Sequence, residues 1–230
     1  MTATRPDGSI LEKSALFAGL DRKALDGLAR LSRHVSLDAG QQLFQQGDAS
    51  DGCYAVLEGL LKVSTASSEG GEALLAIIAA GDVIGEMGLI GGEPRSADVT
   101  ALKPSSLAFL ASRDFNRFAD ENPVVYRHML VIVSSRLRAS NDAFAAYQLL
   151  PLSGRLARVL LRLGEGFGQE IDGKRLLIRQ KFTQTDLAKM TGSARENVNR
   201  QLNDWRADKL ISRISGYYCI DNKEKLSEIA

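Results

Sequence analysis

The sequence predicts an α+β fold, with a β-roll (a jelly roll), one long helix and a smaller helical region that ends in a hairpin. Three observations support this prediction. Short apolar runs separated by glycine fill residues 35–110. Large apolar residues recur every seven positions between 122 and 150. Two helix-start signals and a hairpin-turn signal follow residue 183.

Bulk composition fits an ordinary globular chain. The 230 residues leave room for one large domain or two small ones. Hydrophobic residues make up 44% and charged residues 25%, both typical values. No apolar run approaches the roughly 18 residues of a membrane span, and Met1–Ser9 is polar, without the apolar core of a signal peptide. We therefore expect a cytoplasmic protein with no membrane partner.

Cysteine and histidine are too scarce for a metal site. Cys53 and Cys219 lie far apart in the chain and form no C-x-x-C pair. The histidines are His34 and His128. With no nucleophile–base set and no ligand cluster in the pattern, we expect no metal and no enzymatic activity.

The charge is unevenly divided along the chain. Residues 1–150 hold 14 Lys+Arg against 18 Asp+Glu, a net −4, and residues 151–230 hold 15 against 10, a net +5, which together give the 29 and 28 of the whole chain. A basic C-terminal third on an acidic remainder suggests that this third meets a polyanion. A solvated basic helix face would give the same count.

We expect three parts: a β-roll in residues 1–121, a long dimerisation helix and hinge in 122–150, and a C-terminal domain in 151–230. Eight strands of the roll are expected where apolar or alternating runs occur between glycine turns. These runs are Val35–Leu37, Gln42–Phe44, Tyr54–Leu57, Leu60–Ser64, Ala73–Ile78, Asp82–Ile84, Ala97–Ala101 and Leu107–Leu110.

The long helix carries the heptad seam of a coiled coil. Its a and d positions are Leu130, Val133, Leu137 and Phe144, which predict an isologous homodimer through the same helix of a second copy. The polar pair Ser140–Asn141 interrupts this seam. Such a pair either sets the register of the two helices or contacts something bound there.

Pro151 ends the long helix, because it lacks an N–H and its ring clashes with the preceding turn. Leu149–Pro151 is therefore the candidate hinge. A second amphipathic helix begins near Ser153, a glycine-rich loop is expected over 164–173, and a strand over 176–179.

One glycine-rich segment of the roll, 85–97, carries Glu86, Arg95 and Ser96. Glycines let several backbone N–H groups approach one ligand. An arginine suits a phosphate, and an ionised Glu only accepts hydrogen bonds, which suits a sugar hydroxyl. A phosphate cradle and a surface hairpin with a Glu–Arg ion pair both fit this composition.

Two capping boxes mark a helix-turn-helix in the C-terminal domain. Thr183 with Asp186 begins one helix, Ser193 with Glu196 begins the next, and Gly192 forms the turn between them. The hairpin signal Ser215–Gly216 lies between two short apolar runs. Two helices and such a hairpin predict a winged helix-turn-helix.

Together these motifs resemble the cyclic AMP receptor protein (CRP/FNR) family of bacterial transcription regulators. Gly85-Glu86-Met87-Gly88-Leu89 followed by Pro94-Arg95-Ser96-Ala97 is similar to the phosphate-binding cassette of cyclic-nucleotide-binding domains. The resemblance covers about residues 16–220. It implies a cyclic nucleotide as allosteric effector, with double-stranded DNA, a second copy and RNA polymerase as partners.

The resemblance also implies roles for individual residues in the nucleotide site. Gly85 and Glu86 hold the ribose 2′-hydroxyl, Arg95 pairs with the cyclic phosphate, and Arg136 lies where it could pair with Glu86 or remain exposed. Ser140 and Asn141 fall where the family's long helix contacts the nucleotide base, usually through two hydroxyl residues. Asn141 is an amide, which could bind adenine or guanine, so cyclic GMP remains an alternative to the favoured cyclic AMP. The expected nucleotide-binding residues are Gly85, Glu86, Met87, Arg95, Ser96, Ala97, Ser140 and Asn141.

At the DNA interface the second short helix enters the major groove. Arg195, Glu196 and Arg200 are implied to read the bases of a palindromic TGTGA-type site. Arginine suits guanine and glutamate suits the amino group of cytosine, although phosphate contact or helix capping would also explain them. The secondary contacts expected are Thr183, Thr185, Lys189, Ser193 and Asn199.

Other functions remain open from the sequence. One is a regulator of the same fold that acts without ligand or senses another signal. Another is a nucleotide-sensing module whose helix-turn-helix docks on protein. Iron–sulfur and haem relatives are disfavoured, because they need clustered cysteines or additional histidines.

Overall fold

The structure, a computed structural model, describes residues 11–68 and 71–230, so the polar segment Met1–Ser9 lies outside the described residues. The chain divides into two compact units, Met1–Arg138 and Ala139–Ala230. The division falls inside the long helix α5 (Val124–Leu149), which matches the helix predicted over 122–150.

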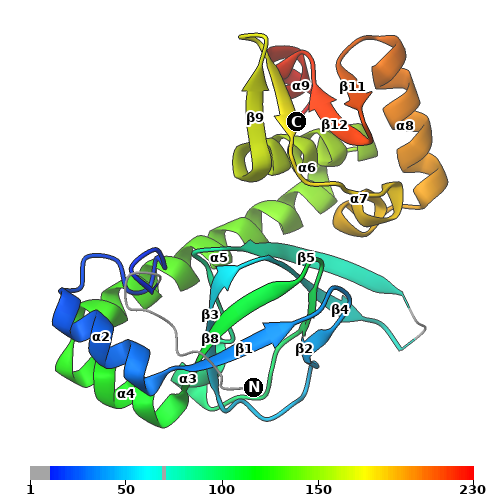
Figure 1. Ribbon diagram of the computed structural model, residues 1–230. Helices are drawn as coiled ribbons and strands as arrows, with labels where there is room; N and C mark the ends of the chain where they lie inside the picture. The colour runs from blue at the N-terminus through cyan, green and yellow to red at the C-terminus, as the bar shows by residue number, and fades with distance from the viewer. Residues whose placement is uncertain (1–10, 69–70) are drawn as a thin grey trace. The chain divides into compact units, whose positions relative to one another are not determined.

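The N-terminal unit contains all eight predicted strands, which form two four-stranded sheets (Figure 1). One sheet has the order β1-β8-β3-β6 and the other β2-β7-β4-β5, and all their pairings are antiparallel. The bounds are β1 Arg33–Leu37, β2 Gln42–Phe44, β3 Gly52–Glu58, β4 Leu60–Ala66, β5 Glu72–Ala79, β6 Val83–Ile84, β7 Asp98–Ala101 and β8 Ser105–Ala111.

Strand β3 shows why this roll has two cores. Successive side chains of a strand point to opposite faces of the sheet. Tyr54 and Val56 are buried in the core between the two sheets. Cys53 and Ala55 belong to the second core, on the other face of the same strand. Both faces of β3 are therefore buried, which explains its nearly continuous apolar run.

Helices cover the outer face of the β1-β8-β3-β6 sheet. Helix α2 (Arg22–Leu31) begins at Asp21, whose carboxylate accepts from the N–H of Ala24 at 2.8 Å. Its apolar face packs in the same core as α4 (Ser112–Glu121) and the first turns of α5. This packing anchors the N-terminal part of α5 to the roll.

Helix α3 (Met87–Gly91) occupies the glycine-rich segment, where no helix was predicted from the sequence. It begins after Glu86 and ends at Gly92, whose φ of 66° is left-handed. At five residues it is too short and too rich in glycine to show an amphipathic period.

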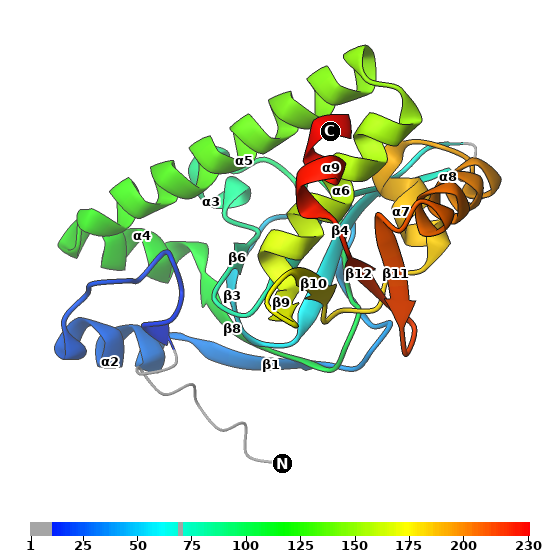
Figure 2. The same cartoon turned by 90° about the horizontal axis from the view of Figure 1, so that it is seen from above.

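The C-terminal unit is a winged helix-turn-helix, as predicted. Figure 2 shows α9 lying beside α6, with the strands and the pair α7 and α8 around them. Its sheet has the order β11-β12-β10-β9. The bounds are α6 Leu152–Phe167, β9 Gly168–Ile171, β10 Arg175–Ile178, α7 Gln184–Thr191, α8 Arg195–Ala207, β11 Ile211–Ile214, β12 Tyr217–Ile220 and α9 Lys223–Ile229.

The predicted loop over 164–173 is wrong. Helix α6 continues to Phe167, and β9 begins at the next residue. Gly164 and Gly168 are packing residues, because a Cβ on either would lie 2.7 or 2.6 Å from the side chain of Leu176. The glycines that suggested a loop instead allow the close approach of β10.

Arg155 bridges the break at Pro151 within this unit. Its Nη1 donates to the Leu150 carbonyl at 3.0 Å, and its Nε donates to the Thr191 carbonyl at 2.9 Å. The guanidinium also lies 5.2 Å from the centre of the Tyr147 ring. One side chain thus joins the end of α5, the start of α6 and the end of α7.

Candidate functional site

Arg95 is a buried cation held from several sides. Its side chain is only 3% exposed. Nη1 donates to the Gly85 carbonyl at 3.1 Å, and Nη2 donates to Asp51 Oδ1 at 2.9 Å. The guanidinium stacks 4.3 Å above the centre of the Phe44 ring. A guanidinium has five N–H donors, so these two bonds leave donors for an anion.

The turn at Gly47–Asp48 positions the backbone of Arg95. The Arg95 N–H donates to the Asp48 carbonyl at 2.8 Å, and the Gly47 N–H donates to the Arg95 carbonyl at 2.8 Å. Gly85 is equally constrained, with a φ of 82° and a position where a Cβ would lie 2.3 Å from Arg95 Nη1. Only glycine satisfies both conditions.

Glu86 is a buried carboxylate with one free oxygen. The residue is 1% exposed. Arg136 of α5 forms an ion pair with Glu86 Oε1 and donates to the Val83 carbonyl. Glu86 Oε2 is also buried, yet it has no hydrogen-bond partner among the described residues. An orphaned acceptor of this kind suits a hydroxyl donor from a ligand.

These contacts decide two of the sequence predictions. The pairing of Arg136 with Glu86 is confirmed. The alternative of a surface hairpin with a Glu86–Arg95 ion pair is wrong, because both residues are buried and each pairs with another partner. The sequence could not show that Asp51, 44 positions before Arg95, would be that partner.

The remaining cassette residues line up near the same segment. Ser96 is exposed, and its hydroxyl donates to the sulfur of Met87 at 3.7 Å. Ala97 is buried.

Burial, together with the nearby charge of Glu86, raises the pKa of the Cys53 thiol to about 12. Cys53 is therefore a neutral core residue and not a reactive thiol.

The seam residues of α5 are largely uncovered in the single chain. Leu130, Leu137 and Phe144 are 63%, 61% and 65% exposed, and Val133 is half-buried. Ser140 and Asn141 are exposed on the part of α5 that belongs to the C-terminal unit.

The helix-turn-helix begins with a complete capping box. The Asp186 N–H donates to Thr183 Oγ1 at 3.1 Å, and the Thr183 N–H donates to Asp186 Oδ2 at 2.7 Å. Gly192 ends α7 with a left-handed φ of 60°. Arg195, Glu196 and Arg200 of α8 are exposed, so all three are available to a partner.

The second predicted capping box, Ser193 with Glu196, is wrong. The N-cap of α8 is Ala194, which makes no side-chain cap bond. The Ser193 N–H instead donates to the Ala188 carbonyl at 3.1 Å and completes the end of α7. Because the two helices are so close in sequence, ending the first uses the residue that would have started the second.

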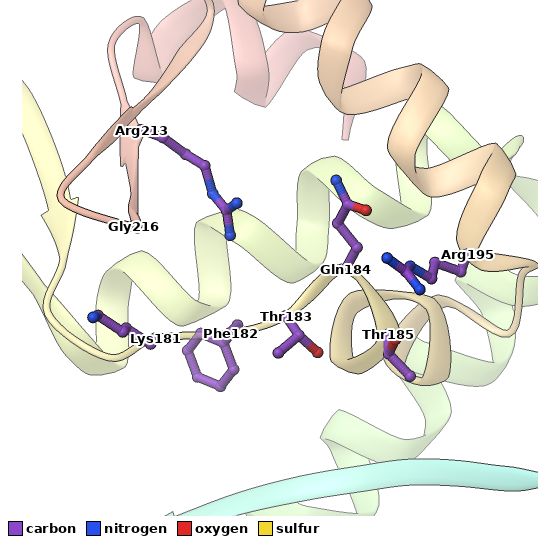
Figure 3. A pocket seen from close by; sticks show the side chains of 8 residues that line it. All are labelled: Lys181, Phe182, Thr183, Gln184, Thr185, Arg195, Arg213 and Gly216. Atoms are coloured by element: carbon purple, nitrogen blue, oxygen red, sulfur yellow. The ribbon is translucent and has the colours of Figure 1, made fainter.

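A basic hollow of about 490 Å³ lies between the helix-turn-helix and the wing (Figure 3). Arg213 extends from the β11–β12 hairpin towards its middle, and Arg195 lies on the opposite side. None of the described residues that line it is acidic. They are Lys181, Phe182, Thr183, Gln184, Thr185, Arg195, Arg213 and Gly216.

The hollow brings together three predicted residues, Thr183, Thr185 and Arg195, with cations that the sequence interpretation missed. Lys181 Nζ lies 5.1 Å from the centre of the Tyr217 ring, and the Arg213 guanidinium lies 4.5 Å from that of Tyr218. Aromatic rings thus hold both cations beside the wing. Their signal in the sequence was weak, since each is an isolated basic residue.

The other predicted contacts do not line the hollow: Lys189, Ser193, Glu196, Asn199 and Arg200. Across the described residues, no three His, Cys, Asp or Glu side chains group as a metal site would require. No described helix is both long and apolar enough to cross a membrane.

Two protein-family models match the chain, one within each of its two compact units. Residues 34–122 match the family "Cyclic nucleotide-binding domain". Residues 154–229 match the family "Crp-like helix-turn-helix domain".

The chain belongs to the CRP/FNR family of transcription regulators. A relative from Mycobacterium tuberculosis, named as a CRP-like cAMP-activated global transcriptional regulator, is 26% identical over 96% of this chain and 98% of its own. The cAMP-activated global transcriptional regulator CRP of Escherichia coli is 28% identical over 74% of this chain and 80% of its own. Both relatives are named as transcriptional regulators, a class of protein that is not enzymatic.

Solved structures share the fold of the whole chain. A structure of CooA from Carboxydothermus hydrogenoformans has a TM-score of 0.79 at 19% identity and covers 98% of this chain and 97% of its own. The c-di-GMP responsive regulator CLP of Xanthomonas campestris has a TM-score of 0.74 at 20% identity, with coverages of 87% and 99%. At these identities the likeness describes the fold alone.

Proposed function

We propose that the chain is a cytoplasmic, homodimeric transcription regulator whose binding to a palindromic TGTGA-type site is controlled allosterically by cyclic AMP. RNA polymerase is its expected partner on DNA. The relatives from M. tuberculosis and E. coli are named as cAMP-activated, which favours cyclic AMP over cyclic GMP. In this proposal residues 1–121 bind the nucleotide, residues 122–150 form the dimerisation helix and hinge, and residues 151–230 bind DNA.

The observation that carries the proposal is that one cassette holds both a buried cation, Arg95, and a buried carboxylate, Glu86, one of whose oxygens has no hydrogen-bond partner among the described residues. Arg95 offers N–H donors to a cyclic phosphate. Glu86 offers Oε2, which lacks a donor, to a ribose 2′-hydroxyl. A cyclic ribonucleotide presents both groups on one rigid ring system. The remaining proposed contacts are Gly85, Met87, Ser96 and Ala97, and Ser140 and Asn141 for the base.

The exposed seam supports the homodimer. Leu130, Leu137 and Phe144 repeat at heptad spacing and are each more than half exposed in one chain. Such a stripe is stable in water when a second helix covers it. Nucleotide contact at Ser140 and Asn141 would then act directly on the helix that joins the two copies.

The C-terminal unit supports DNA reading through α8. Arg195, Glu196 and Arg200 are proposed base contacts. Thr183, Thr185, Lys189 and Ser193 are proposed to contact phosphates and position the helix, and Asn199 is a further proposed contact near the outer bases of the half-site. In a two-fold dimer the two α8 helices must lie about 34 Å apart to fit successive major grooves.

Calorimetry on the nucleotide-free protein tests the effector. We expect cyclic AMP to bind, 2′-deoxy-cyclic AMP to bind about tenfold more weakly because Glu86 Oε2 loses its donor, and Arg95→Gln to reduce the affinity by at least tenfold. Binding to a TGTGA palindrome is then measured with and without each nucleotide. Cyclic GMP is the matched comparison for the base.

Three results would contradict this function. Unchanged nucleotide affinity in Arg95→Gln would show that the cassette is not the site. DNA binding that is indifferent to every nucleotide would favour a ligand-independent regulator of the same fold. Binding that is insensitive to salt would favour docking on protein, since phosphate contacts make DNA affinity fall with salt.

A further inference from the structure

A hydrogen bond between two amide side chains joins the two helices of the DNA-binding unit. Gln184, the first residue of α7, donates from Nε2 to Asn199 Oδ1 at 2.6 Å. Both side chains are half-buried. The bond orients the Asn199 amide, because Gln184 donates to one lone pair of its carbonyl oxygen, and the Nδ2 donors remain for another acceptor.

The pair lies beside the residues proposed to read DNA. Asn199 follows Arg195 by four positions on α8, so the two side chains share one face of the helix. Gln184 lines the same hollow as Arg195 (Figure 3). A contact from Asn199 would therefore fall next to the base that Arg195 contacts.

We propose that the Gln184–Asn199 pair reads the N7 atom of a purine adjacent to the bases contacted by Arg195, Glu196 and Arg200. This inference rests on the proposed function and adds a specificity determinant to it. A free asparagine reads adenine with its oxygen and its nitrogen together. Here the bond from Gln184 restricts how the amide can turn, so its Nδ2 donors suit an acceptor that adenine and guanine share.

The test replaces one atom of the DNA at a time. The operator is first selected from a random pool by the wild-type protein with cyclic AMP. Each purine of the half-site is then replaced by its 7-deaza analogue, which exchanges N7 for C–H. At one position we expect the 7-deaza substitution to reduce the affinity of the wild type about three- to tenfold, which corresponds to the loss of one hydrogen bond. The same substitution should leave the affinity of Asn199→Ala unchanged. Purines read by arginine keep their penalty in both proteins.

Asn199→Asp sharpens the test. Its carboxylate still accepts from Gln184, but the donor that faces DNA becomes an acceptor. We expect the N7 penalty to vanish and the base preference to shift towards an exposed amino group, that of cytosine or adenine. Asn203→Asp is the matched control, since it adds the same charge at an exposed position of α8. We expect it to preserve the N7 penalty.

Gln184→Ala tests the orienting role of the pair. Without Gln184 the Asn199 amide is free to turn, so we expect the penalty at that one purine to shrink while those at arginine-read purines persist.

Distinct results would overturn the inference and the proposed function. If Asn199→Ala keeps every 7-deaza penalty of the wild type, the pair reads no purine N7. If a neutral methylphosphonate in place of one phosphate abolishes the contribution of Asn199, its partner is the backbone and the base reading is wrong. If the wild type selects no DNA at all, the proposed function fails together with the inference.

Discussion

The two units of the chain use charge in opposite ways. In the N-terminal unit Glu86 and Arg95 are almost completely buried, and each has a fixed protein partner. In the C-terminal unit Arg195, Glu196 and Arg200 are exposed. A buried ion pair is little screened by salt, whereas exposed charges are screened over about 8 Å at physiological ionic strength.

The difference matches the partners proposed for the two sites. A small ligand offers few contacts, so each must be strong and held in place before binding. A DNA backbone offers many phosphates, so each contact can be modest and their sum still large. Substitutions should therefore act through stability and geometry in the first unit, and through salt-dependent affinity in the second.

The largest effect is expected from Arg136→Leu, which leaves the Glu86 carboxylate buried without its cation. Because Arg136 is about one-third exposed, water softens the cost, and we expect a loss of about 2–4 kcal/mol in the free energy of unfolding. Urea denaturation measures it. The double variant Arg136→Leu with Glu86→Gln removes the charge and should recover most of the loss. Equal stability of the single variant and the wild type would contradict the buried pair.

Gly85→Ala should weaken nucleotide binding by about ten- to a hundredfold, since a Cβ 2.3 Å from Arg95 Nη1 must displace the guanidinium. Gly92→Ala is the matched control. It also replaces a glycine with a left-handed φ, but nothing lies within 4 Å of its Cβ. Calorimetry with cyclic AMP compares the two. Similar losses in both variants would attribute the effect to backbone strain and not to Arg95.

In the second unit, Lys181→Gln and Arg213→Gln should each reduce the slope of log affinity against log salt by about one, as expected for one lost phosphate contact. The affinity at low salt should fall about three- to tenfold. Arg158→Gln, an exposed change on α6 away from the residues that line the hollow, is the control. A slope unchanged from the wild type would exclude the hollow from the DNA interface.

The smallest effect distinguishes the true capping box from the false one. Thr183→Ala removes the bond to the Asp186 N–H and should cost about 1 kcal/mol in the free energy of unfolding. Ser193→Ala should change it by less than about 0.5 kcal/mol, because the Ser193 side chain caps no helix. Thermal or urea denaturation without DNA measures both. A larger loss from Ser193→Ala would restore the second box.

Local patterns account for what the sequence could predict. The eight strands were predictable because glycine turns and apolar alternation act over a few residues. The long helix followed from its heptads, whereas for Arg136 the sequence left pairing with Glu86 and exposure equally open, and only the structure decides between them. Thr183 was recognisable as a cap because its partner Asp186 is only three positions away.

Features that depend on packing were not predictable. Gly164 and Gly168 suggested a loop, and only the position of Leu176 shows why they are glycines. Asp51 gives no sequence signal as the partner of Arg95. Lys181 and Arg213 become part of one site only when the wing folds back beside α7.

Arg155 has a mechanical consequence for the C-terminal unit. One helix can move another only when the connection between them is rigid. The Arg155 guanidinium binds the Leu150 and Thr191 carbonyls and stacks on Tyr147. These contacts restrict the flexibility that the helix break at Pro151 would otherwise allow. We therefore expect a small rotation at the end of α5 to carry the turn before α8 with it, so that Arg155 limits bending at the candidate hinge Leu149–Pro151.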